Sequence, residues 1–222
     1  MRQGNVSVVS FSVGFATGLY GISFGALSIA AGLDIWQTCV LSLFMFSGGS
    51  QFAFIGVLGT GGLAALPAAI LSAWMLGVRN GFYAVNISPL LGSLGFKRPI
   101  AAQLTIDEST AVATSREGAE QVRGFWLTGG YVFLFWNLMT VLGALLGSVI
   151  GDPKDWGLDA SAAAAFVALV WPRLVDSRLR LTAFLSLLVA VLSSPTLPVG
   201  VPILLAGAVA LAVWLVPGRG QK

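Results

Sequence analysis

Histidine is absent from the 222-residue chain, and cysteine occurs only once, as Cys39. Without histidine the chain has no Ser-His triad or dyad, no HExxH zinc site and no histidine proton relay. A single cysteine excludes an internal disulfide, so we expect Cys39 to be a small packing residue and expect no metal site. Charged residues make up 9% of the chain, against about 25% in ordinary soluble domains. A water-soluble protein with so few charges could not cover its surface.

Long uncharged stretches are the main positive feature of the sequence. They cover residues 6–33, 35–78, 124–151 and 181–216, and each reaches or exceeds the ~20 residues that a membrane-spanning helix needs. The mean hydropathy is +0.88. We therefore predict an all-α polytopic membrane protein, with residues 1–222 forming a single transmembrane domain in the lipid bilayer.

Clusters of glycine, proline and polar residues divide these stretches into helices. We expect seven spanning helices, at residues 8–31, 35–58, 63–85, 124–150, 160–175, 179–192 and 199–216. A polar segment, residues 97–123, follows the third helix. With the N terminus outside, the cytoplasmic side would hold most of the basic residues, as the positive-inside rule requires. We therefore predict a bacterial cytoplasmic (inner) membrane protein with an external N terminus, a cytoplasmic C terminus and a cytoplasmic segment 97–123.

A weak internal repeat accompanies this pattern. The tripeptide Gly-Leu-Asp precedes the second expected helix, ending at Asp34, and the fifth, ending at Asp159. Three expected helices separate the two copies, so they would point in opposite directions, as in transporters built from inverted repeats. The halves would be residues 8–95 and 122–195, with a final helix at 199–216. A chance match of three residues is the alternative.

The stretch Phe46-Ser47-Gly48-Gly49-Ser50-Gln51 lies inside an otherwise apolar run. We predict that the second helix breaks at residues 47–49, near mid-membrane, where freed amides at a helix start suit a carboxylate. The predicted substrate-binding residues are Ser47, Gly48, Gly49, Ser50, Gln51, Phe46, Trp136 and Asn137. The alternative is a small-residue contact between continuous helices, with Gln51 bonded to a neighbour.

Glycines also recur at spacings of three and four in the first expected helix, at Gly14, Gly18, Gly21 and Gly25. Small residues at this spacing let two membrane helices approach closely. An unwound point at residues 21–23 is the functional alternative.

Two groups of polar residues are candidates for coupling or gating. Arg79 and Asn80 lie late in the third expected helix, where an ionisable residue is a functional candidate, although Arg79 could instead snorkel to the headgroups. Asp107 and Glu108 lie in a segment, residues 104–113, that could form an amphipathic helix. Either they are ordinary loop charges, or one has a raised pKa and carries a proton, or one pairs with Arg79.

Five segments in order carry a resemblance to a known family. They read GISFGALSIAAGL, FSGGSQFAFIGVL, LGVRNGFYAVNISPLL, QLTIDESTAVATS and GLDASAAAAFVAL. Together they resemble the AzlC family of branched-chain amino acid exporters over residues 14–169. The resemblance implies export of L-valine, leucine or isoleucine, and a separate small membrane subunit of the AzlD type. The family's usual Arg-His pair is Arg79-Asn80 here, which leaves Asp107 or Glu108 to couple protons.

We therefore predict a secondary, proton-coupled exporter of small hydrophobic amino acids rather than an enzyme. The chain has no Walker A motif and no sizeable soluble domain, so we expect no nucleotide, no other cofactor and no nucleic-acid partner. One alternative is a passive channel or a non-transporting assembly subunit. Another is an intramembrane aspartyl enzyme, which the position of Asp34 and Asp159 at helix starts disfavours.

Overall fold

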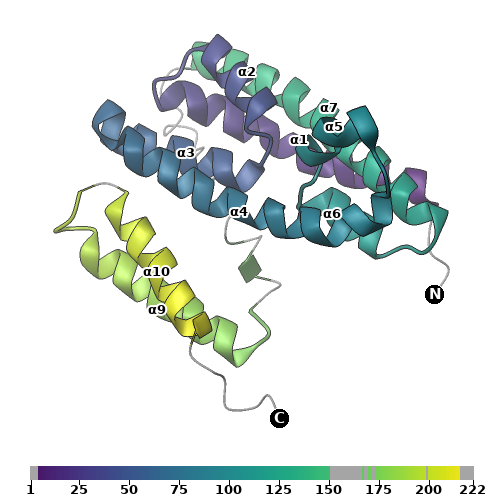
Figure 1. Ribbon diagram of the computed structural model, residues 1–222. Helices are drawn as coiled ribbons and strands as arrows, with labels where there is room; N and C mark the ends of the chain where they lie inside the picture. Colours follow the sequence, from purple (N-terminus) through teal and green to yellow (C-terminus); the bar gives the residue numbers. More distant parts are fainter. Residues whose placement is uncertain (1–4, 151–166, 168–169, 172–173, 199, 216–222) are drawn as a thin grey trace.

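The computed structural model describes residues 5–150, 167, 170–171, 174–198 and 200–215, and every regular element in these ranges is a helix (Figure 1). Three helical stretches are long and apolar enough to cross a membrane: Val6–Ala30, Gly48–Leu91 and Ala119–Val149. Large apolar side chains such as Phe82 and Trp74 are two-thirds exposed on the outside of the bundle, where lipid would cover them. The all-α membrane class predicted from composition is confirmed.

Helices α1 (Val6–Ala30) and α7 (Ala119–Ile150) form the closest pair in the bundle. The glycines of α1 face α7 along its length: a Cβ on Gly14 would lie 2.5 Å from the Cβ of Tyr131, and one on Gly21 would lie 2.6 Å from the carbonyl of Trp136. Because α1 is continuous, the predicted tight packing is confirmed and the unwound point at residues 21–23 is wrong.

The same contacts fix the relative direction of the two helices. Arg123 donates to the Ser7 hydroxyl near both N-terminal ends, and Thr128 donates to Ser10 at 2.8 Å, while Gly147 meets Ala26 near both C-terminal ends. Helices α1 and α7 are therefore parallel, as Figure 1 shows. The sequence predicted opposite directions for residues 8–31 and 124–150, which is wrong.

We call the end of the bundle that holds Val6 the Val6 face, and the opposite end the Ala30 face. The chain reaches the Ala30 face at the end of α1 and starts again there with α2 (Ile35–Phe44), where the Asp34 carboxylate and the Gln37 side chain form a reciprocal cap. A capping box of this kind satisfies amides that the first helical turn leaves free.

The chain does not cross the membrane through residues 35–58. Helix α2 ends at Phe44, an irregular turn follows, and α3 (Gly48–Gly61) leads back. Leu33, before α2, packs against Val57 and Leu58 near the end of α3. Residues 33–61 are therefore a re-entrant hairpin that begins and ends at the Ala30 face, and we call it the first hairpin. The predicted break is present, but the predicted second spanning helix is wrong, because the break reverses the chain.

After the short 3₁₀ turn η1 (Gly62–Ala65), helix α4 (Leu66–Leu91) crosses to the Val6 face. Its 26 residues extend about 39 Å at ~1.5 Å per residue, enough for a ~30 Å hydrocarbon core. The helix continues through Pro89 to Leu91, beyond the predicted end at residue 85.

The polar segment after α4 forms a second, shorter hairpin. It contains the 3₁₀ turn η2 (Gly95–Lys97), helix α5 (Arg98–Gln103) and helix α6 (Asp107–Thr114). Leu104, between α5 and α6, meets Gly129 of α7, whereas Val112 near the end of α6 meets Gly124, closer to the Val6 face. The second hairpin, residues 95–114, therefore enters the bundle from the Val6 face and returns to it.

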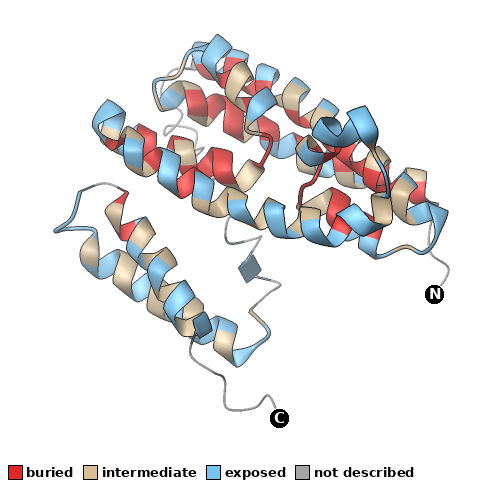
Figure 2. Ribbon diagram, viewed as in Figure 1, coloured by how far each residue is buried: buried red, intermediate tan, exposed pale blue. Residues whose placement is uncertain are grey.

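The tips of the two hairpins meet. The side-chain amide of Gln103, at the end of α5, donates to the carbonyl of Leu43, near the end of α2, at 2.6 Å. The first hairpin's tip is Met45–Phe46–Ser47 and the second's is Leu104–Thr105–Ile106, all buried except Met45. Figure 2 shows buried residues concentrated on the facing sides of α1, α3 and α7 and along the link between α5 and α6.

Helices α9 (Ser177–Ser193) and α10 (Val201–Leu215) form a final antiparallel pair that matches the predicted sixth and seventh helices. Arg178 donates to the carbonyls of Val213 and Trp214 at the end of α10, and Gly207 of α10 meets Met75 of α4. Most of the predicted fifth helix and Asp159 lie outside the described residues, so the equivalence of Asp34 and Asp159 stays a prediction. The parallel direction of α1 and α7 does not fit an inverted repeat that begins with these two helices.

Candidate functional site

A cavity of about 260 Å³ lies where the two hairpin tips meet the middle of the crossing helices. Helix α1 contributes Thr17 and Tyr20, α4 contributes Arg79 and Asn80, and α7 contributes Val132 and Trp136. The first hairpin contributes Phe46, Ser47, Gly48, Gly49 and Phe52, and the second contributes Ile106, Asp107 and Glu108. Five separate segments of the chain therefore build one site at mid-depth.

Arg79 forms an ion pair across the cavity wall with the second hairpin. Its Nη2 lies 2.8 Å from Oδ2 of Asp107, and the two side chains are 22% and 20% exposed. Arg79 is also near the middle of α4 rather than at its end. The snorkelling interpretation is therefore wrong, and the pairing of Arg79 with an acidic residue is confirmed.

Asp107 is held by more than one group. The hydroxyl of Tyr83, one turn beyond Arg79 on α4, donates to Oδ1 of Asp107, while Oδ2 accepts from Arg79. Asp107 is also the first residue of α6, where the positive end of the helix dipole favours a carboxylate. These contacts hold the Asp107 carboxylate in one position and join α4 to the second hairpin.

Glu108 occupies the next position but has different surroundings. It lines the cavity and accepts a hydrogen bond from the side chain of Thr17 on α1. Glu108 lies on α6, which is outside the three helical stretches that are long and apolar enough to cross a membrane. Burial raises the pKa of Glu108, and the charge of Asp107 adds to this effect, while the α6 backbone, Arg79 and Thr17 oppose it. Of the two acidic residues, Glu108 is the one suited to bind and release a proton.

The two glycines at the start of α3 make the close approach of other elements possible. A Cβ on Gly48 would lie 2.9 Å from Cη2 of Trp136, and a Cβ on Gly49 would lie 3.0 Å from Nη2 of Arg79. The guanidinium therefore sits beside the first turn of α3, whose leading amides have no partner within the helix. Because a cation at a helix N terminus is unfavourable, this end of the cavity is suited to an anionic group.

The rest of the wall is apolar and aromatic. Phe52 of α3 packs edge-on to Trp136 of α7 and to Phe24 of α1, with ring centroids 6.3 and 6.0 Å apart. Phe46 meets Phe133 edge-on. The side chains of Ile106 and Val132 complete this surface and are themselves buried. The cavity therefore has a charged end and an apolar side.

Three polar atoms on cavity residues are buried without a hydrogen-bond partner in the described part of the chain: Trp136 Nε1, Asn80 Oδ1 and Arg79 Nε. A buried polar atom left unpaired costs about 1–3 kcal/mol. Two of these atoms are donors and one is an acceptor, a set that a small ligand with both acceptor and donor groups can satisfy.

The cavity brings together nine of the residues selected from the sequence: Phe46, Ser47, Gly48, Gly49, Arg79, Asn80, Asp107, Glu108 and Trp136. The other three lie outside its lining. Ser50 donates to the Ser47 hydroxyl, Asn137 donates to the carbonyl of Phe133 within α7, and Gln51 is fully buried and donates to the carbonyl of Ser42 at 3.4 Å. For Gln51, the structure therefore agrees with the alternative to substrate binding, in which its side chain bonds a neighbouring element.

Five lining residues were not selected from the sequence: Thr17, Tyr20, Phe52, Ile106 and Val132. Thr17 and Tyr20 carry a usable signal in retrospect, because they interrupt the glycine pattern of α1 with polar groups near its midpoint. The others are ordinary apolar residues in apolar segments, and only the approach of distant elements assigns them to the cavity.

Comparison with known proteins identifies the family of the chain. A family model described as AzlC protein matches residues 12–150, which include all but the last two described helices. The chain is also 23% identical over 179 residues to an uncharacterized membrane protein of Helicobacter pylori strain 26695, covering 78% of this chain and 76% of that protein. A protein of the same description from strain J99 is 22% identical over the same length, with the same coverage. No solved structure matches. Because the family model covers more than half of the chain, this membrane protein belongs to the AzlC family.

Proposed function

We propose that this protein exports branched-chain or other small hydrophobic amino acids, such as L-valine, across the bacterial cytoplasmic membrane. In this proposal it is a secondary, proton-coupled transporter and the large subunit of a two-component exporter whose other part is a small AzlD-type membrane protein. It is not an enzyme, and its transport cycle uses no cofactor.

The observation that carries the proposal is the division of the mid-membrane cavity into a charged end and an apolar side. At the charged end, Arg79 and the free amides of Gly48 and Gly49 favour a carboxylate, as helix starts do for anions. Glu108 and the unpaired Oδ1 of Asn80 favour an ammonium group. A zwitterionic amino acid carries both groups on one carbon, so it matches both subsites.

The apolar side and the size of the cavity favour a short hydrocarbon side chain. Phe46, Phe52 and Trp136 are each less than a tenth exposed, and burial of a methylene against such a surface contributes about 0.8 kcal/mol. The volume, about 260 Å³, is below the ~300–1,000 Å³ usual for drug-sized ligands. Valine, leucine and isoleucine fit this description better than a peptide or a large aromatic solute.

Two features favour a transporter over the passive-channel alternative. The site lies at mid-depth, and interrupted helices build it from both faces, as in secondary transporters that use broken helices for substrate binding. In addition, the Gln103–Leu43 hydrogen bond joins the hairpin tips beside the site. Each hairpin can then serve as the gate towards its own face.

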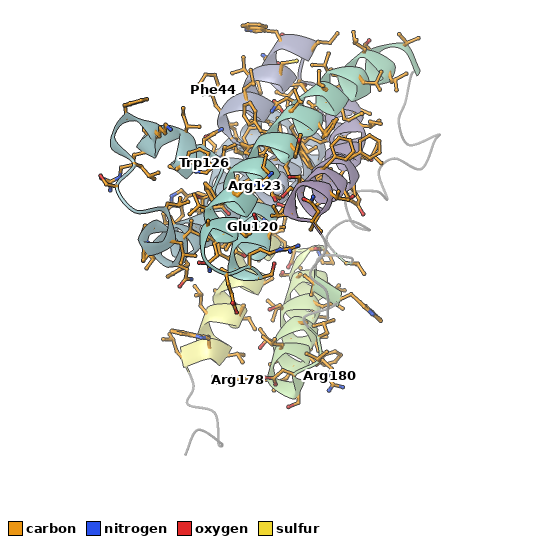
Figure 3. The ribbon with its side chains drawn as sticks, turned by 90° about the vertical axis from the view of Figure 1, so that its right-hand side faces the viewer. Phe44, Glu120, Arg123, Trp126, Arg178 and Arg180 are labelled. Carbon is orange, nitrogen blue, oxygen red and sulfur yellow. The ribbon has the colours of Figure 1, made fainter. Side chains whose placement is uncertain are left out.

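We also propose that the Val6 face is cytoplasmic. Lys97, Arg98, Arg116 and Arg123 lie at this face with the second hairpin and the start of α7. Arg178 bonds the end of α10, which runs alongside α4 towards the same face. Figure 3 shows Arg123 near Glu120 on α7, and Arg178 and Arg180 together on α9. By the positive-inside rule, the start of α1 and the end of α10 would then lie on the cytoplasmic side.

Counterflow in proteoliposomes tests the proposal. The chain is reconstituted with and without its small membrane partner, and uptake of labelled valine is measured into vesicles loaded with valine, leucine, isoleucine or a polar amino acid. We expect exchange with the three branched-chain amino acids when both subunits are present. Uptake that depends neither on the internal amino acid nor on the partner would contradict a two-component transporter and favour a channel.

A further inference from the structure

The described residues that line the cavity carry more negative than positive groups. Among the described residues, its lining contains one cation, Arg79, and two carboxylates, Asp107 and Glu108. Arg79 lies 2.8 Å from Asp107, and the Tyr83 hydroxyl also donates to Asp107. Glu108 faces Thr17 of α1 and shares the cavity with Tyr20 of the same helix. An incoming cationic group therefore finds Glu108 as the cavity carboxylate that lies outside the Arg79–Asp107 ion pair.

We propose that the substrate's ammonium group and a proton compete for the Glu108 carboxylate, and that this competition couples amino-acid export to proton entry. The inference rests on the proposed function and names the group that would perform the coupling. Asp107 has a different role in this scheme: its ion pair with Arg79 holds the guanidinium in place for the substrate's carboxylate.

The exchange balances as follows. When the cavity is open to the cytoplasm, a zwitterionic amino acid binds, its ammonium pairs with the Glu108 carboxylate, and the proton that Glu108 carried leaves to water. When the cavity is open to the outside, a proton binds Glu108, the ammonium loses its partner, and the amino acid dissociates. One proton enters for each amino acid exported, and no bond in the substrate forms or breaks.

The burial of Glu108 also supports its role as the group that exchanges a proton for the substrate's ammonium. Burial raises its pKa, so the empty site holds the proton at a higher pH than an exposed glutamate would. Substrate binding requires the ionised form, so binding weakens as the pH falls below the pKa of Glu108. In that range one competing proton changes the apparent Kd by about tenfold per pH unit.

Calorimetry of the purified two-subunit complex measures this exchange directly. Valine is titrated in buffers of equal pH but different ionisation enthalpy, which gives the number of protons released per valine bound. We expect about one proton at pH values below the pKa of Glu108, falling to zero above it. Valine binding without proton release would overturn the inference while leaving the proposed function intact, whereas absence of valine, leucine and isoleucine binding would overturn both.

One variant and its matched control assign the effect to Glu108. Glu108→Gln should release no proton, bind valine with a Kd that does not change with pH, and bind about 10- to 100-fold more weakly at high pH, where a charged partner is lost. Glu120→Gln, at the exposed start of α7, is the matched control and should behave like the wild type. Unchanged proton release in Glu108→Gln would overturn the inference.

If Glu108→Gln does not fold, Thr17→Val gives an independent measurement. It keeps the size of the side chain and removes the hydroxyl that stabilises the ionised form of Glu108. The pH at which valine binding weakens should then move upward. A pH profile identical to that of the wild type would contradict the role of Glu108.

Discussion

The two re-entrant hairpins reach the same cavity with opposite kinds of sequence. Apart from Leu33 and Asp34, the first hairpin lies in an uncharged run that extends from residue 35 to 78. Its tip contributes the aromatic ring of Phe46 to the cavity, and the start of α3 contributes two glycines. The second lies in the polar segment after α4, and the start of its helix α6 contributes two carboxylates. Both reverse at mid-depth, and both place the N terminus of a helix, α3 or α6, beside the cavity.

The comparison teaches that hydropathy alone does not distinguish a crossing helix from a hairpin that returns. The apolar first hairpin resembles a spanning helix because its outer surface meets lipid, as the 79% exposure of Phe44 indicates. The polar second hairpin resembles a loop, yet Ile106, Ser109 and Val112 are buried against the bundle. Irregular backbone is tolerated at this depth only where protein or a wet cavity satisfies it.

Cysteine labelling from one side of the membrane has the largest expected effect, because it is all-or-none. In a Cys39→Ser background, single cysteines at Asn5, Ser93 and Glu117 should all react from the cytoplasmic side, and a cysteine at Thr60 should react from the outside. The reason is that both hairpins return to the face from which they start. If cysteines at Asn5 and Thr60 react from the same side, then residues 33–61 cross the membrane and are no hairpin.

Gly48→Val or Gly49→Val should abolish valine counterflow by disrupting the packing of the start of α3 against the cavity. The added side chain at either position meets Trp136 or Arg79 within 3.0 Å, so the ring or the guanidinium must leave its place beside α3. The matched control is Gly56→Val on the same helix, where a Cβ meets nothing within 4 Å. Equal loss of transport in Gly56→Val would attribute the effect to helix α3 in general rather than to the cavity.

Arg79→Gln tests the link between α4 and the second tip. Removing one partner of a fully buried ion pair costs about 3–5 kcal/mol, since the other charge stays unpaired. The Arg79–Asp107 pair is partly exposed, so we expect a smaller loss of thermal stability together with weaker valine binding. The double variant Arg79→Gln/Asp107→Asn should recover much of the stability but not the binding. The exposed pair Arg123–Glu120, 3.6 Å apart, supplies the control, because Arg123→Gln should change stability by less than about 1 kcal/mol. Normal valine affinity in Arg79→Gln would remove Arg79 from the site.

Gln103→Ala should have the smallest effect, because it removes one neutral hydrogen bond between the tips. The amide of Gln103 donates to the Leu43 carbonyl at 2.6 Å, and such a bond contributes about 1 kcal/mol. We expect a small fall in the unfolding temperature and a change in the rate of counterflow rather than in valine affinity. Gln51→Ala, which removes a longer bond within the first hairpin, is the comparison. A lower valine affinity in Gln103→Ala with an unchanged rate would mean that the contact shapes the site instead of gating it.

Local features predicted more of the site than of the topology. The break near Gly48 was predictable because two glycines and two serines interrupt an apolar run, and Arg79, Asp107 and Glu108 were predictable because charge is rare in this chain. The direction of the chain after the break was not predictable, because a broken helix and a reversed one have the same local composition. The orientation predicted from lysine and arginine positions depended on that direction. It put the start of α1 and residues 97–123 on opposite faces, whereas the structure puts the start of α1 and the start of α7 at the same face.

The sequence by itself determined that the chain is helical and embedded in a membrane, because lipid leaves an uncharged chain no other way to satisfy its backbone. It also determined that a helix breaks near Gly48. Only the tertiary structure decided that α1 and α7 run parallel, that residues 33–61 return to their starting face, and that Arg79 pairs with Asp107. These features depend on contacts between residues far apart in the chain. Local composition is compatible with several arrangements of these helices. The close glycine contacts between α1 and α7 and the Arg79–Asp107 ion pair stabilise the observed one.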